Sequence, residues 1–140
     1  MASRASAVER LPDVPLFARC TARDLRVVAR HIEIVEAPEG TDVVREGEEG
    51  ETFFIILEGR AAIVRKGRTI GELTSGCYFG ELALLDPAPR AVTVRAVTPV
   101  LLAGLGHRMF KVLLREMPAL SSQLLASLAA ELRQARAGIG

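Results

Sequence analysis

Turn-forming residues divide the middle of this chain into short segments of similar length. Between residues 31 and 105, glycine or proline recurs at roughly the 8–12-residue spacing that is typical of all-β domains. The apolar runs between these turns cover 41–45, 53–58, 61–65, 68–73, 91–97 and 100–105. Strands this short pair with their neighbours through tight turns, so the spacing predicts an antiparallel barrel or sandwich.

Helical patterns flank this region on both sides. Thr21 and Asp24 form a Thr-x-x-Asp start signal that resembles a capping box and predicts an N-terminal helix. Beyond the last strand, the spacing predicts one helix over 107–117 and a second that Pro118 restarts. The leucines of the second helix recur at positions 120, 124, 128 and 132. This apolar face packs either on the barrel or on a second subunit, which would give a homodimer through the C-terminal helices.

The charge balance limits the partners of the chain. Lys and Arg number 18 and Asp and Glu 17, and a net charge of +1 gives no bulk attraction to nucleic acid or anionic lipid. The longest uncharged stretch, 117–130, is shorter than the ~20 residues of a membrane span. The N-terminus lacks the apolar block of a secretory signal, and Cys20 and Cys77 are isolated. We therefore expect a cytoplasmic protein that binds no membrane.

Residues that would carry catalysis are sparse. A metal-dependent barrel enzyme needs clustered His and carboxylate ligands on adjacent strands, whereas the two histidines, His31 and His107, fall near the ends of the predicted barrel. No Cys–His or Ser–His–Asp arrangement stands out. We expect no enzyme activity, no metal and no cofactor.

One segment, Phe79–Val94, does not have the pattern of a scaffold. Gly80 opens a helix-prone stretch that is too short for packing alone, and two prolines then break it before Arg90. The first N–H groups of a helix lack intrahelical partners and favour an anion, and an arginine can donate two hydrogen bonds to a phosphate. Glu81 would repel that phosphate, so its presence suggests a neighbouring hydroxyl donor such as a ribose offers.

The same residues carry a family resemblance. Phe-Gly-Glu-Leu-Ala-Leu, a short gap and Pro-Arg-Ala before a strand resemble the phosphate-binding cassette of the cyclic nucleotide-binding domain family. That family includes protein kinase A regulatory subunits, the catabolite activator protein and cyclic-nucleotide-gated channels, and residues 43–59 resemble a second family signature. The resemblance covers residues 11–136. It implies a mainly β fold, an antiparallel β jelly-roll barrel with an N-terminal helix, a short phosphate-binding helix and two C-terminal helices. The ends, 1–10 and 137–140, are expected to be flexible.

The resemblance also implies a role for each matching residue. Glu81 would accept a hydrogen bond from the ribose 2′-hydroxyl, Arg90 would pair with the cyclic phosphate, and Gly80 would permit close approach. The N–H groups that complete the phosphate site would belong to Leu82, Ala83 and Ala91. The last helix would cover the base as a lid, and its candidate contacts are Arg133, Gln134 and Arg136.

Together these implications predict a receptor module for a cyclic nucleotide. Ala91 lacks the hydroxyl with which cGMP-preferring members contact guanine, so cAMP is the preferred ligand and cGMP the second candidate. Ligand binding would rotate the two C-terminal helices and signal to an effector protein that the sequence does not identify. No helix-turn-helix segment follows the last helix, so we expect no direct DNA binding. Two alternatives stay open: a regulatory piece of a larger cAMP-controlled enzyme, channel or transporter, and a barrel without ligand binding that acts as a protein-interaction scaffold.

Overall fold

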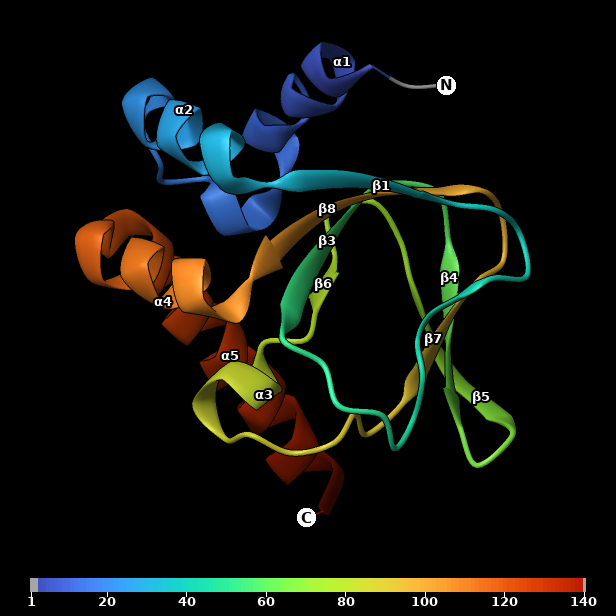
Figure 1. Cartoon of the computed structure of the whole chain (residues 1–140). Helices are drawn as coiled ribbons and strands as arrows, with labels where there is room; N and C mark the ends of the chain where they lie inside the picture. Colours follow the sequence, from blue (N-terminus) through green and yellow to red (C-terminus); the bar gives the residue numbers. More distant parts are fainter. Residues whose placement is uncertain (1–2, 140) are drawn as a thin grey trace.

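Two four-stranded antiparallel sheets face one another across the centre of the molecule (Figure 1). The computed structural model describes residues 3–139. The first sheet contains, in spatial order, β1 (Glu33–Ala37), β8 (Val100–Gly106), β3 (Thr52–Glu58) and β6 (Tyr78–Phe79). The second contains β2 (Asp42–Val44), β7 (Thr93–Ala96), β4 (Ala61–Arg65) and β5 (Arg68–Leu73). The expected fold class, an antiparallel β jelly-roll barrel with flanking helices, is confirmed.

The two central strands of the first sheet, β3 and β8, are buried on both of their faces. On β3, Phe53 and Ile55 pack against the helices, whereas Ile56 belongs to a second apolar cluster inside the barrel with Leu102 and Val94. A strand that is covered on both faces needs apolar residues at consecutive positions rather than at alternate ones. This explains the uninterrupted apolar runs at 53–57 and 100–105.

The N-terminal helices cover one end of this sheet. They are α1 (Arg4–Val8), the 3-10 turns η1 (Leu11–Asp13) and η2 (Pro15–Phe17), and α2 (Ala22–His31). The predicted capping box is present, because the Asp24 N–H donates to Thr21 Oγ1 and the Thr21 N–H donates to Asp24 Oδ2, both at 3.1 Å. A capped α2 leads directly into β1.

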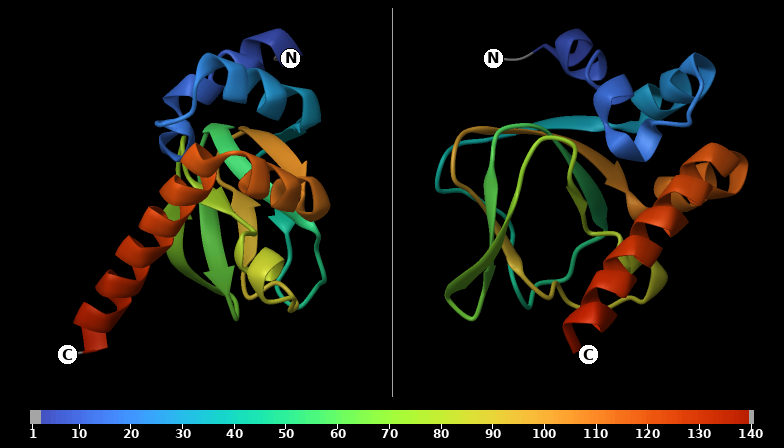
Figure 2. Two further views of the ribbon diagram at one scale, coloured as in Figure 1. Left: turned by 90° about the vertical axis from the view of Figure 1, so that its left-hand side faces the viewer. Right: turned by 180° about the vertical axis from the view of Figure 1, so that it is seen from behind.

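Of the helices in the second half of the chain, one lies between β6 and β7 and two follow β8. They are α3 (Leu82–Leu85), α4 (His107–Glu116) and α5 (Pro118–Ile139). Met117, buried and with φ −120°, separates α4 from α5. Leu120 and Leu124 are buried under η2, but Leu132 is 53% exposed. Leu128 is half-buried and packs against the same core, so Leu132 alone of the four predicted leucines is exposed. Figure 2 (left) shows the end of α5 running away from the barrel and apart from α3.

The termini differ in part from the expected flexible segments. Of the ranges 1–10 and 137–140, residues 1, 2 and 140 lie outside the described part of the chain. Residues 4–8 form α1, whose Ala7 is fully buried, and residues 137–139 continue α5. Between residues 3 and 139, no helix is long and apolar enough to cross a membrane.

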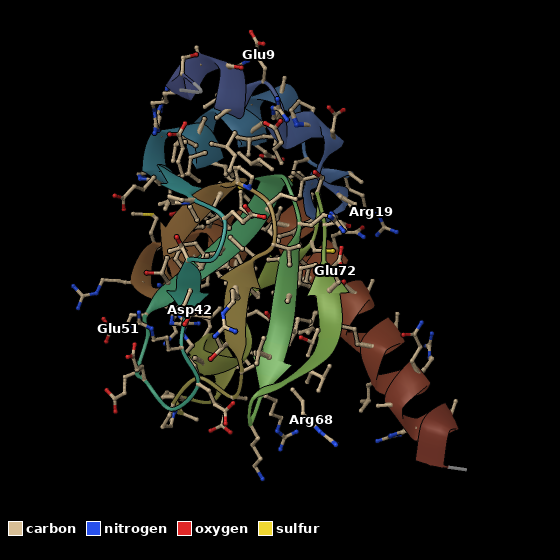
Figure 3. The ribbon with its side chains drawn as sticks, turned by 90° about the vertical axis from the view of Figure 1, so that its right-hand side faces the viewer. Glu9, Arg19, Asp42, Glu51, Arg68 and Glu72 are labelled. Atoms are coloured by element: carbon tan, nitrogen blue, oxygen red, sulfur yellow. The ribbon has the colours of Figure 1, made fainter. Side chains whose placement is uncertain are left out.

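The second sheet carries ion pairs between side chains of β2 and β7 and the residue that follows β2. Asp42 on β2 accepts a hydrogen bond from Arg95 Nε on β7 at 2.7 Å and lies 3.5 Å from Arg45 Nε. The Arg95 hydrogen bond holds the pKa of the Asp42 carboxyl below its usual range. Figure 3 looks at the side of the barrel that carries Asp42. Exposed pairs of this kind contribute little to stability, so they do not mark the functional site.

Candidate functional site

The site begins at the turn between β6 and α3. Gly80 has φ +92°, a conformation that side chains with a Cβ rarely adopt. A Cβ built at this position would lie 2.7 Å from the Thr52 carbonyl oxygen and 2.8 Å from Arg90 Nη1. Glycine therefore lets the chain turn into α3 while the arginine lies directly against the backbone.

Arg90 is held by its own backbone and by its side chain. Its Nη2 donates to the Thr52 carbonyl oxygen at 2.9 Å. Its backbone N–H donates to the Glu48 carbonyl, and its carbonyl accepts from the Gly47 N–H, both at 2.8 Å. A Cβ at Gly50 would lie 2.3 Å from Arg90 Nε. The guanidinium thus lies between the backbones of Gly50 and Gly80, and its hydrogen bond to the Thr52 carbonyl orients it.

Glu81 is the buried charged side chain of the described residues, with 9% of its surface exposed. Burial raises the pKa of its carboxyl, and the charge of Glu131 raises it further, whereas its own backbone N–H and Arg90 lower it. Burial likewise lowers the pKa of Arg90, against the effect of Glu81. Among residues 3–139, no ion pair joins Arg90 to Glu81 or to any other carboxylate. The cation and the carboxylate therefore lie in one region without neutralising each other directly.

A cavity of about 470 Å³ connects these side chains. Its volume is in the range of roughly 300–1,000 Å³ that small-molecule sites occupy. Its lining includes all six residues that the sequence assigned to ligand binding: Gly80, Glu81, Leu82, Ala83, Arg90 and Ala91. The barrel strands and their ends add an apolar part to this lining, through Val44, Ile63, Leu73, Phe79, Val92 and Val94.

Helix α5 reaches the region of this cavity at Ser127. The Tyr78 hydroxyl donates to Ser127 Oγ at 2.8 Å, which ties β6 to α5. Burial raises the pKa of Tyr78, the Ser127 hydrogen bond lowers it, and the charges of Glu131 and Glu81 raise it. Two residues of α5 therefore interact with side chains that line the cavity: Ser127 through its hydrogen bond to Tyr78, and Glu131 through its charge, which acts on Tyr78 and Glu81.

The three predicted lid residues lie further along α5. Arg133, Gln134 and Arg136 are exposed, and none of them lines the cavity. Tyr78 was not among the predicted site residues, although this single tyrosine of the chain stands directly before the cassette. Nothing in the local sequence around Ser127 indicates its contact, because its partner is 49 residues away.

His107 was also missed as a neighbour of the site. Its ring Nε2 lies 2.9 Å from the Gly80 carbonyl oxygen, within hydrogen-bonding distance. Its backbone N–H donates to the Glu51 carbonyl at 2.8 Å. The first residue of α4 is thereby joined to the turn that positions Glu81. Across residues 3–139, no group of His, Cys, Asp and Glu is arranged to hold a metal ion.

The fold is that of a β-barrel domain with a cavity of small-molecule size against its strands. The family model for the cyclic nucleotide-binding domain matches residues 34–117, and the chain belongs to this family. The predicted family resemblance is thus confirmed.

Curated relatives carry the same domain within longer chains. The cAMP-dependent protein kinase regulatory subunit of Mycosarcoma maydis is 47% identical over 91 residues, which cover 61% of this chain and 17% of that protein. The corresponding subunit of Emericella nidulans is 37% identical over 106 residues, covering 74% and 26%. This chain therefore spans about a quarter or less of the length of these relatives.

Solved structures agree on the fold. The structure of cAMP-bound PfPKA-R has a TM-score of 0.81 and 30% identity, covering 98% of this chain and 47% of that one. The catabolite activator protein of Thermus thermophilus has a TM-score of 0.82 and 27% identity, covering 89% and 61%. Both similarities extend over the barrel and most of its flanking helices.

Proposed function

We propose that this chain is a cyclic nucleotide receptor module that prefers cAMP and has no catalytic activity of its own. The observation that carries the proposal is the pair Arg90 and Glu81, which line one cavity without forming an ion pair with each other. The relatives above are regulatory subunits by name, and one similar structure is described as cAMP-bound. These names support the choice of ligand and of a regulatory role.

Each part of the nucleotide has a complementary surface in the cavity. The cyclic phosphate would take two hydrogen bonds from Arg90 and further ones from the N–H groups of Leu82, Ala83 and Ala91. The ribose 2′-hydroxyl would donate to Glu81, and a hydrogen bond to a charged group contributes about 1.5–3 kcal/mol. The base would lie on the apolar wall of the barrel and be covered by α5.

Ala91 supports a preference for cAMP over cGMP. It lines the cavity next to Arg90, and its methyl group offers no hydroxyl to a guanine. Ala91→Thr should therefore raise the affinity for cGMP while leaving that for cAMP nearly unchanged. An unaltered cGMP affinity, measured by calorimetry, would remove Ala91 from the selectivity argument.

The signal would leave the domain through its C-terminal helices. Phosphate capture would move α3, and the break at Met117 would let α5 rotate relative to α4 and reach an effector protein. The exposed half of α5 could instead join two copies of the chain. We place this module in the cytoplasm, without direct contact to DNA. The relay predicts that cAMP shifts the amide resonances of residues 110–136, and tight binding with unchanged resonances there would contradict it.

The test of the receptor function is calorimetry with cAMP and cGMP on three proteins. Arg90→Ala should lose about 2–5 kcal/mol of binding free energy, because it removes a charge-assisted phosphate contact. Arg68→Ala is the matched control, since Arg68 is exposed at the start of β5 and away from the cavity. Equal affinity in Arg90→Ala and Arg68→Ala would overturn the site. No binding by the unmodified protein would favour the protein-interaction scaffold.

A further inference from the structure

His107 occupies a junction between two parts that the receptor mechanism must connect. It is the first residue of α4, the helix that leads to Met117 and α5. Its ring lies 2.9 Å from the carbonyl of Gly80, the residue that precedes Glu81. No side chain caps the N-terminus of α4. The contact between the His107 ring and the Gly80 carbonyl directly links the start of this helix to the cassette. A change in the strength of this one contact would therefore act on both parts.

The charged groups around His107 come from every neighbouring element. Arg90 approaches from the cassette, Glu51 from the connection before β3, and Lys111 from the next turn of α4. Burial, Arg90 and Lys111 lower the pKa of the imidazole, whereas the hydrogen bond to Gly80 and the charge of Glu51 raise it. The His107 side chain also lines a groove of about 530 Å³, and Glu49 and Arg108 are further charged residues in the lining of that groove.

We propose that His107 is a positioning residue whose protonation tightens binding of the cyclic nucleotide by fixing the Gly80–Glu81 turn. The inference rests on the proposed receptor function. A protonated imidazole donates a charge-assisted hydrogen bond to the Gly80 carbonyl, which is stronger than that of the neutral ring. The turn that carries Glu81 is then held more firmly in the geometry that meets the ribose.

Linkage fixes the direction of the effect. A phosphate bound at Arg90 offsets the positive charge that opposes protonation of His107. Ligand binding therefore raises the pKa of His107, and by reciprocity the protonated protein binds the ligand more tightly. We expect this coupling to change the affinity about three- to tenfold between the neutral and the protonated protein.

The first experiment measures cAMP affinity by calorimetry between about pH 5 and pH 8, the range in which histidine titrates. His107→Gln keeps an N–H that can donate to the Gly80 carbonyl but does not titrate. His31→Gln is the matched control, because His31 is exposed at the end of α2. Protonation of Glu81 at low pH weakens binding in all three proteins, so the ratio of the affinities of the unmodified protein and His107→Gln isolates the histidine.

We expect this ratio to grow about three- to tenfold from pH 8 to pH 5 and the His31→Gln profile to follow that of the unmodified protein. Parallel profiles for the unmodified protein and His107→Gln would overturn the proposal. If the hydrogen bond had a purely structural role, the affinities of the unmodified protein and of His107→Gln would differ by the same factor at every pH, and their profiles would be parallel.

A second readout separates this proposal from the receptor function. Without nucleotide, the Glu81 amide resonance should shift with the midpoint of His107, and His107→Gln should lack this step. The step together with no cAMP binding at any pH would reject the receptor function and leave the coupling between His107 and the cassette in place. Absence of the step would overturn the coupling itself.

Discussion

The turn at Gly80 allows a sharp test of how tightly the site is built. In Gly80→Ala, the new Cβ would lie 2.7 Å from the Thr52 carbonyl oxygen and 2.8 Å from Arg90 Nη1. The arginine can move away, but the carbonyl belongs to β3 and cannot without shifting a central strand. The left-handed backbone adds about 1–2 kcal/mol for any residue with a Cβ, and the overpacking adds about 1–3 kcal/mol. We therefore expect a total destabilisation of about 2–5 kcal/mol.

Gly40→Ala is the control that separates the two contributions. Gly40 has φ +85°, close to that of Gly80, but a Cβ there would meet nothing within 4 Å. It should therefore lose only the backbone part, about 1–2 kcal/mol. Urea unfolding followed by circular dichroism measures both, since the chain has no tryptophan. Equal losses in the two variants would refute the close approach of Gly80 to β3, and the cAMP affinity should fall in Gly80→Ala alone.

Three further predictions concern charge, the contact of α5 and a helix start. Because the raised pKa of Glu81 lets the folded protein hold a proton that the unfolded chain releases, stability falls as the pH rises from the ordinary glutamate range through the raised value. Glu81→Gln should thus gain stability relative to the unmodified protein between about pH 4 and pH 7 in urea unfolding, and a constant difference would contradict it. Tyr78→Phe and Ser127→Ala should each lose about 1 kcal/mol, and the double variant no more than one of them; additive losses would show that the hydroxyls do not interact. Thr21→Ala should cost about 0.5–2 kcal/mol of unfolding free energy with unchanged cAMP affinity, and a stability equal to that of the unmodified protein would show that the cap contributes nothing.

The parts that sequence predicted well are those in which the signal is local. The six predicted ligand-binding residues, from Gly80 to Ala83 and Arg90 with Ala91, line one cavity, because a single turn, a short helix and a short loop bring them together. The predicted runs 61–65 and 68–73 match β4 and β5. The strand β6 was not predicted, because two residues are too few to show a period. The chemical roles of the cassette residues stay predictions that the binding experiments address.

The lid shows where local signals end. The position of α5 depends on the break at Met117 and on the packing of Leu120 and Leu124 under η2. These contacts join residues that are about a hundred positions apart, so no pattern within the helix reports them. They bring Ser127 and Glu131 toward the cavity and leave Arg133 in solvent.

The Tyr78–Ser127 hydrogen bond lies between two segments of α5 that differ in how far they are buried. The segment before Ser127 carries the buried Leu120 and Leu124, whereas the segment beyond it is mostly exposed and ~18 Å long at the rise of an α-helix. If this segment of α5 tilted by about 10° about the Tyr78–Ser127 hydrogen bond, the end of the helix would move by ~3 Å. Under the proposed relay, the length of this exposed segment would convert a small rotation at Ser127 into a displacement of several ångströms at the end of the helix.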